Sequence, residues 1–178
     1  MTVQRQERYG RRPVMGLFAL LAAFFASSCL DLAALNLGAL NSQALAATTE
    51  RVVANRYSGL AIEGFDPVAY FTDSMAIQGL PDFEAAQAGA VWRFRNASDR
   101  ASFVAHPDIY GPQYGGYDPI DLARGVMVAG NPRFWLVSGQ RLYLFGREQT
   151  RDAFAADPSR VLRSANLRWP ELEETLAQ

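Results

Sequence analysis

The stretch Val91-Trp92-Arg93-Phe94-Arg95 alternates apolar side chains with arginine, and this period of two is typical of a half-buried strand. A helix is expected directly after it, because Asn96 or Ser98 can cap a helix start and His106-Pro107 would end the helix. Together they make a strand–helix unit, which predicts a fold in which helices pack on a small sheet.

The same order of residues returns 51 positions further along the chain. Tyr143-Leu144-Phe145 corresponds to Trp92-Arg93-Phe94, and a second helix is expected at 148–156. The helices and their ends also match: Arg100, Phe103, Ala105 and Pro107 correspond to Arg151, Phe154, Ala156 and Pro158. We interpret this as two copies of one unit, in which each helix phenylalanine packs on its own strand. The alternative is that two unrelated strand–helix segments converged on the same spacing.

The remaining elements are expected around these two units. The runs 134–137 and 142–145 predict a β-hairpin with Gly139 in its turn. Asp118-Pro119 predicts the cap and first residue of a short helix, a strand is expected at 126–129, and a final helix at 159–176 would break at Pro170. The expected fold is α+β: a small, twisted, mainly antiparallel sheet of four to six strands with short helices packed on one side.

Residues 1–46 have the pattern of an export signal. Four arginines precede the uncharged run 13–30, and the pair Arg11-Arg12 is similar to a twin-arginine signal. Ala44-Leu45-Ala46 predicts cleavage after Ala46; the alternatives are lipidation of Cys29 and an uncleaved membrane anchor at 13–30. We therefore expect a periplasmic or secreted protein, or otherwise a membrane-anchored one, whose leader has the export machinery as its partner.

The mature part would consist of an extended lead-in at 47–61 and a single domain at 62–178. The chain has 17 Arg and Lys against 18 Asp and Glu; the leader takes four and two of these, which leaves 13 against 16 and a net charge near −3. This balance argues against a nucleic-acid partner. Cys29 is the only cysteine and His106 the only histidine, so a mature chain would have no disulfide, Cys-ligated metal, iron–sulfur cluster or His-rich zinc site.

Several strings of the mature chain resemble exported bacterial proteins with a YHS domain. They occur in the same order and are 64–71, 92–94, 110–117, 142–144 and 165–170, with single matches at Phe103, Pro107 and Trp135. The resemblance implies a small domain for which metal binding has been suggested. The family usually has cysteine directly after the Tyr-Gly-Gly-Tyr string, whereas this chain has Asp118, so a soft-metal site cannot be built at that position. Asp118 with Asp121 or Asp66 could offer oxygen ligands instead, or Asp118 could simply cap the helix that follows it.

The segment 110–117 is the main candidate for a binding site, because its three tyrosines and three glycines allow close approach of a ligand to the backbone between aromatic walls. The candidate ligand-binding residues are Tyr110, Tyr114, Gly115, Gly116, Tyr117 and Asp118. The alternative is a loop that packs tightly over the core. His106 is expected to meet the last helical carbonyls or solvent rather than to act as a base or metal ligand.

Three functions remain open from the sequence. The first is a periplasmic accessory module that binds a small ligand or a metal ion near 110–118. The second is a structural or partner-binding domain without a small-molecule site. The third is a small enzyme that uses Asp118, His106 and tyrosine hydroxyls, and it requires these groups to come within hydrogen-bonding distance. Contact with a membrane is expected only through the leader or a lipidated Cys29.

Overall fold

Two β-hairpins form the sheets of the protein, which we describe from a computed structural model covering residues 50–176. The chain divides into two units, Met1–Ala46 and Ala47–Gln178, and all described residues belong to the second. The predicted leader, its cleavage site after Ala46 and Cys29 lie outside the described residues.

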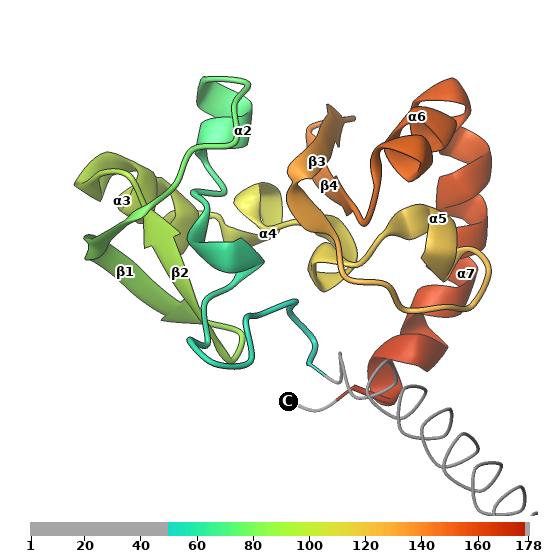
Figure 1. Cartoon of the computed structure of the whole chain (residues 1–178), viewed down its shortest axis with the longest axis horizontal. Coiled ribbons are helices and arrows are strands. Elements are labelled where there is room, and N and C mark those ends of the chain that lie inside the picture. Colours follow the sequence, from blue (N-terminus) through green and yellow to red (C-terminus); the bar gives the residue numbers. More distant parts are fainter. Residues whose placement is uncertain (1–49, 177–178) are drawn as a thin grey trace, which may run out of the picture. The chain divides into compact units, whose positions relative to one another are not determined.

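The first hairpin pairs β1 (Leu80–Gln87) with β2 (Ala90–Phe94), and the second pairs β3 (Asn131–Ser138) with β4 (Arg141–Phe145). Figure 1 shows one hairpin in each half of this unit. The α+β class is therefore confirmed, but the strands form two separate two-stranded antiparallel sheets and not one sheet of four to six strands.

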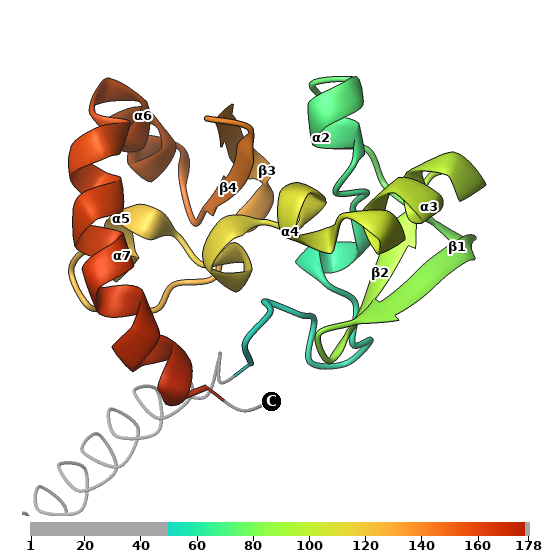
Figure 2. The ribbon, with the colours of Figure 1, turned by 180° about the vertical axis from the view of Figure 1, so that it is seen from behind.

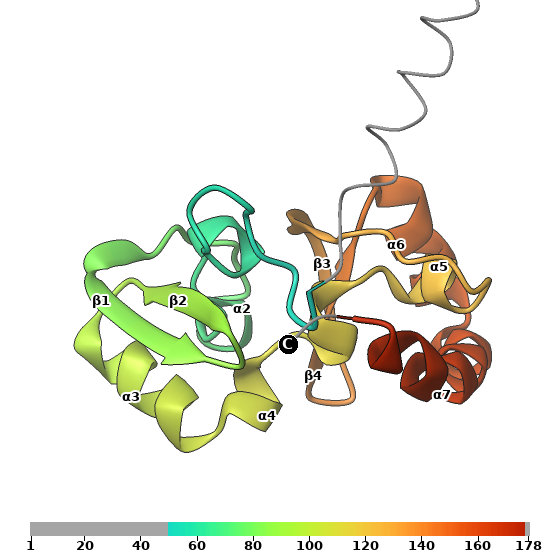
Figure 3. The ribbon, with the colours of Figure 1, turned by 90° about the horizontal axis from the view of Figure 1, so that it is seen from below.

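Short helical segments precede and follow each hairpin. They are η1 (Ile62–Gly64), α2 (Ala69–Thr72), α3 (Ala97–Ala105), α4 (Pro107–Tyr110), η2 (Gln113–Gly116), α5 (Pro119–Leu122), α6 (Glu148–Ala156) and α7 (Pro158–Glu174). Pro107 and Pro158 follow the ends of α3 and α6 as predicted, and each is also the first residue of the next helix, where a proline loses no hydrogen bond. Figure 2 shows α3 in front of the first hairpin, and Figure 3 shows α7 beside α5.

Two local predictions were wrong. The segment 126–129 contains only an isolated bridge at Ala129 and no strand. The final helix does not break at Pro170 but continues to Glu174. A proline inside a helix costs about 3 kcal/mol, and the burial of Val161 and Ala165 with the packing of Trp169 on the core offsets that cost here.

The repeat of the strand–helix unit that the sequence spacing predicts is present in the structure, and it extends to the hairpins. Leu80 pairs with Phe94 and Asn131 pairs with Phe145. The outermost pairs of the two hairpins are therefore 51 residues apart in the sequence. Both hairpins then show an irregularity in register directly after this pair. We call residues 60–110 the first repeat and residues 112–174 the second repeat.

Each helix phenylalanine packs on its own strand, as expected. Phe103 lies 4.8 Å from Trp92 and 5.2 Å from Phe94, measured between ring centroids. Phe154 lies 4.9 Å from Tyr143 and 5.3 Å from Phe145. These aromatic groups belong to two core clusters, the first built mainly from the first repeat and the second from the second repeat.

The segments before the hairpins repeat as well, at a spacing of 52 residues. The strings 64–68 (Gly-Phe-Asp-Pro-Val) and 116–120 (Gly-Tyr-Asp-Pro-Ile) each connect a 3₁₀ turn to a short helix. In both, the glycine carbonyl accepts a hydrogen bond of 2.9 Å from a later glycine, Gly79 in the first repeat and Gly130 in the second. The whole order of elements is thus present twice.

Candidate functional site

The predicted binding loop contains the end of α4, Gly111-Pro112 and η2, and most of its side chains pack into the protein. Tyr117 is fully buried, and its hydroxyl donates a hydrogen bond of 2.6 Å to the carbonyl of Glu50. Tyr110 is half-buried, with its ring edge-on to Phe71. Tyr114 is nearly buried and packs edge-on against Trp169, at 5.7 Å between centroids. The alternative of a tightly packed loop therefore describes much of this segment.

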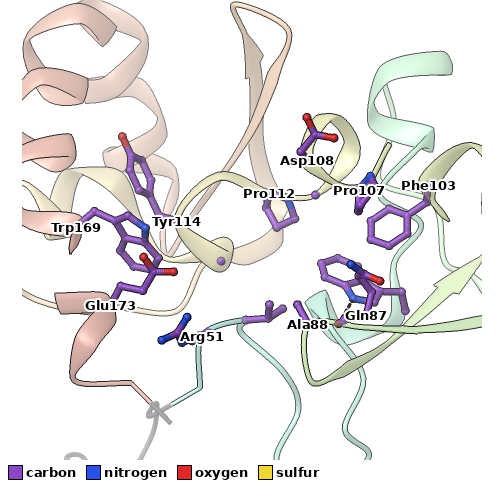
Figure 4. A pocket seen from close by; sticks show the side chains of 14 residues that line it. Arg51, Gln87, Ala88, Phe103, Pro107, Asp108, Pro112, Tyr114, Trp169 and Glu173 are labelled. Atoms are coloured by element: carbon purple, nitrogen blue, oxygen red, sulfur yellow. Dashed lines mark hydrogen bonds between the residues drawn. The ribbon is translucent and has the colours of Figure 1, made fainter. Parts of the chain in front are cut away.

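A groove of about 410 Å³ lies beside this loop, between the two repeats. The aromatic side chains that line it are Trp92 and Phe103 of the first repeat and Tyr114 and Trp169 of the second. Figure 4 shows Trp169, Glu173 and Arg51 on one side of the groove, with Phe103 and Gln87 on the other. Of the predicted ligand-binding residues, Tyr114 and Gly115 line the groove, whereas Tyr110, Gly116, Tyr117 and Asp118 do not.

The segment after the predicted leader forms one rim of the groove. Val53 donates a backbone hydrogen bond of 2.8 Å to the carbonyl of Gly115, which fixes Arg51 and Val52 at the groove. Gly115 has a φ of +62°, and a Cβ at this position would overlap the carbonyl oxygen of Arg51. Glycine is therefore required here by its close approach to the chain as well as by its backbone conformation.

The polar groups of the groove are few. The indole Nε1 of Trp92 donates to the carbonyl of Gln87 at 3.0 Å, which orients that ring inside the wall. Arg51, Asp108 and Glu173 supply the charges of the lining. Burial raises the pKa of the Tyr114 phenol well above its usual value, so this group stays protonated at neutral pH and acts as a hydrogen-bond donor. The groove thus combines an aromatic lining with a charged rim.

Asp118 serves the fold and not the groove. Its Oδ1 accepts a hydrogen bond of 2.9 Å from the backbone of Ile120, which confirms that it caps α5. Its Oδ2 accepts from the backbone of Gly146 at 2.8 Å and from the hydroxyl of Thr150 at 2.5 Å. The carboxylate is 0% exposed, so both oxygens are committed to neighbours inside the protein.

Asp121 is also buried, but its carboxylate faces arginines. Oδ1 accepts from Arg147 at 3.1 Å and from Arg124 at 3.4 Å, and Oδ2 has no hydrogen-bond partner. Within residues 50–176 there is no group of three or more histidine, cysteine or acidic side chains placed to hold a metal ion. The structure therefore does not bring Asp118 and Asp121 together as part of a larger ligand set.

His106 lies at the junction of α3 and α4 and is exposed. Its exposed side chain is consistent with the predicted contact with solvent, while its backbone N–H donates to the carbonyls of Ser102 and Phe103. No hydrogen bond joins it to Asp118, whose oxygens are taken by the three donors above. The arrangement that the enzyme hypothesis required is thus not assembled among the described residues.

The sequence did not point to several residues of the groove. Arg51, Gln87, Phe103 and Glu173 are distant along the chain and meet only through the packing of the two repeats. Trp169 belongs to one of the strings that resemble the YHS family, which was the only signal available for it.

Comparison with known proteins places no further constraint on the site: no family model, curated protein or solved structure matches this chain. Within residues 50–176, none of the helices has both the length and the apolar character needed to cross a membrane.

Proposed function

We propose that this chain is an exported binding module, of the YHS-like class that its sequence resembles, and that it holds a small organic ligand in the groove between its repeats. The observation that carries the proposal is the lining of the groove, in which both repeats contribute aromatic side chains around a volume of about 410 Å³. A volume of this size falls within the range of small-molecule sites.

The charges at the groove support a ligand with an apolar or aromatic body and a polar end. Trp169 and Tyr114 offer ring surfaces on one side, and Arg51 and Glu173 lie beside Trp169 (Figure 4). An aromatic or aliphatic body would gain from contact with the rings, while its polar end reached the charged rim. We favour an organic ligand over a metal ion because the oxygens of Asp118 are already engaged by Ile120, Gly146 and Thr150.

The test uses protein expressed with its own leader in a bacterial host and purified as the cell processes it. The probe is anilinonaphthalene sulfonate, an aromatic anion whose fluorescence rises in apolar sites. We expect it to bind, to quench tryptophan fluorescence and to be displaced by compounds from a panel of small aromatic and aliphatic acids and amines.

A matched pair of variants locates the binding. Trp169→Phe removes the indole at the groove, whereas Trp135→Phe removes one that packs on Tyr70 and does not line the groove. Quenching should fall in the first variant, in which Trp92 is the one tryptophan left at the groove, and should be kept in the second. Equal quenching in both variants, or no compound that displaces the probe, would favour a structural or partner-binding domain instead.

A further inference from the structure

The two repeats hold an equivalent aspartate in the same way. In the first repeat, Asp66 accepts from the backbone of Val68 with Oδ1 and from that of Arg95 with Oδ2, both at 2.9 Å. In the second, Asp118 accepts from Ile120 at 2.9 Å and from Gly146 at 2.8 Å with the same two oxygens. Each aspartate therefore ties an Asp-Pro turn to the end of the second strand of its hairpin.

The third partner of the aspartate differs between the repeats. In the second repeat the hydroxyl of Thr150, on α6, donates to Oδ2 of Asp118. The equivalent residue of α3 is Asp99, and the carboxyls of Asp66 and Asp99 interact with each other. Arg95 binds both of them: its backbone N–H donates to Oδ2 of Asp66 and its Nε donates to Oδ2 of Asp99. Asp66 is 0% exposed and Asp99 is 7% exposed, so water screens neither of them well. Two ionised carboxylates in such contact repel each other, and neither can donate a hydrogen bond.

We propose that Asp66 and Asp99 share one proton, so that the first repeat carries a proton-responsive carboxyl pair where the second repeat carries a fixed threonine–aspartate hydrogen bond. One carboxyl donates this proton to the other and thereby replaces the hydroxyl of Thr150. When the pH rises, the proton leaves to water and the pair acquires a second negative charge in the interior.

The charged groups around the pair indicate where the proton resides. The Nε of Arg95 donates to Oδ2 of Asp99 at 2.6 Å, and its Nη2 pairs with Asp73 at the same distance. The side-chain amide of Asn96 also donates to Oδ2 of Asp99, at 3.2 Å. Oδ2 of Asp99 therefore accepts hydrogen bonds from two side chains, one of them cationic.

Asp66 has no cationic side chain hydrogen-bonded to it, and the phenol of Tyr70 faces it from α2. The pKa of Asp66 is raised to about 6, mainly by burial and in smaller part by the neighbouring Asp99. The hydrogen bonds from the two backbone donors lower it and offset part of this rise. We therefore assign the proton to Asp66.

Loss of the proton would affect the contact between the Asp66 turn and α3. Asp66 connects the turn before α2 to the residue after β2, and Asp99 lies in the first part of α3. Repulsion between the two anions would push the turn away from α3. The second repeat is not subject to this effect, because Thr150 keeps its hydroxyl proton at every pH at which the protein is folded.

Carbon NMR of the side-chain carboxyls tests the proposal directly on the purified protein. We expect one of the two carboxyls to titrate near pH 6 in the wild type. In Asp99→Thr, which copies the second repeat, the Asp66 signal should titrate below about pH 5. Titration of both wild-type carboxyls below about pH 5 would overturn the proposal.

A stability measurement provides the second readout. The ratio of the unfolding equilibrium constants of wild type and Asp99→Thr should rise about 100-fold between pH 4 and 8, because the wild type must give up a proton that the variant never held. The reciprocal variant Thr150→Asp should introduce the same pH dependence in the second repeat. A ratio that stays constant across this range would contradict the shared proton, and the NMR titration of the wild type decides the matter if either variant fails to fold.

Discussion

The hydroxyl of Tyr114 donates a hydrogen bond of 2.7 Å to Oδ1 of Asn166 and thereby ties η2 to α7. Both elements contribute to the groove, since Tyr114 and Trp169 line it. This contact therefore connects the loop that the sequence marked as a candidate site with a helix more than fifty residues away.

Tyr114→Phe tests the contribution of this hydrogen bond. The change keeps the ring and removes only the hydroxyl, so we expect a loss of about 1 kcal/mol in the free energy of unfolding. Weaker binding of the groove probe should accompany it, because the ring is less well fixed. Denaturant unfolding measures the first effect, and Tyr57→Phe is the control because that side chain is 90% exposed. An equal loss in both variants would show that the Asn166 contact contributes nothing.

The hydroxyl of Thr150 offers a second test, this time of the carboxylate that the sequence placed in a candidate site. Thr150→Val removes the donor to Oδ2 of Asp118, which is fully buried, and should cost about 1–3 kcal/mol of stability. Thr150→Ser keeps the hydroxyl and should lose much less. If serine and valine are equally destabilising, the methyl group and not the hydrogen bond is what matters at this position.

Much of this fold was predictable because its signals are local. The strand alternation around Trp92, the cap at Asp118 and the prolines after α3 and α6 are all properties of short segments. The spacing of 51 residues between the repeats then needed only a comparison of the chain with itself. The match between 64–68 and 116–120 was equally visible in the sequence, but its spacing of 52 residues differs by one and conceals it from a search at a single offset.

The groove and the separation of the sheets were not predictable in this way. Strand pairing between hairpins depends on how the repeats pack, and here the outer edges of β2 and β4 meet single residues, Leu60 and Pro112, and not another hairpin. The groove likewise joins Arg51, Trp92 and Trp169, which no local pattern connects. Only part of the role of Asp118 could be predicted from the sequence. Its capping of α5 depends on neighbouring residues, whereas its hydrogen bonds to Gly146 and Thr150 depend on the tertiary fold.

The equivalence of the repeats predicts equal costs for equivalent core deletions. Phe103 and Phe154 are 1% and 0% exposed and contact two rings each, so Phe103→Ala and Phe154→Ala should each cost about 3–5 kcal/mol. Val104→Ala, on the exposed side of α3, should stay within about 0.5 kcal/mol of wild type. Thermal or urea unfolding compares the three. A much smaller cost at one phenylalanine would mean that one repeat contributes little to the cooperative core.

The pH dependence of stability follows from two aspartates with opposite shifts. Hydrogen bonds from Arg95 and Thr72 lower the pKa of Asp73, so its stabilising effect is lost as the pH falls through that lowered value. The pKa of Asp66 is raised from 3.8 to about 6, so the folded protein binds its proton more tightly than the unfolded chain does. Stability from Asp66 is therefore present below about pH 4 and is lost as the pH rises through about 6, by up to about 3 kcal/mol.

Unfolding free energies measured from pH 3 to 8 should consequently decline between about pH 4 and 6 in the wild type. Asp66→Asn removes the titrating group and should flatten this decline. Asp73→Asn should leave the decline in place and should reduce the free energy of unfolding above pH 4. A wild-type profile that rises steadily from pH 4 to 7 would contradict the assignment to Asp66.

Gly79 and Gly130 directly precede β1 and β3, the first strands of the two hairpins, and their replacement tests how closely the chain packs there. A Cβ on Gly79 would lie 2.5 Å from the backbone carbon of Arg93, and one on Gly130 would lie 2.5 Å from the Cβ of Leu144. Backbone and buried side chains cannot move aside cheaply, so Gly79→Ala and Gly130→Ala should each destabilise by about 2 kcal/mol or more. Gly89→Ala is the control: its Cβ would meet open space, and only its φ of +78° would cost, by about 1 kcal/mol. If Gly79→Ala and Gly130→Ala cost no more than Gly89→Ala, the close approach of the chain is not what requires glycine at the two positions.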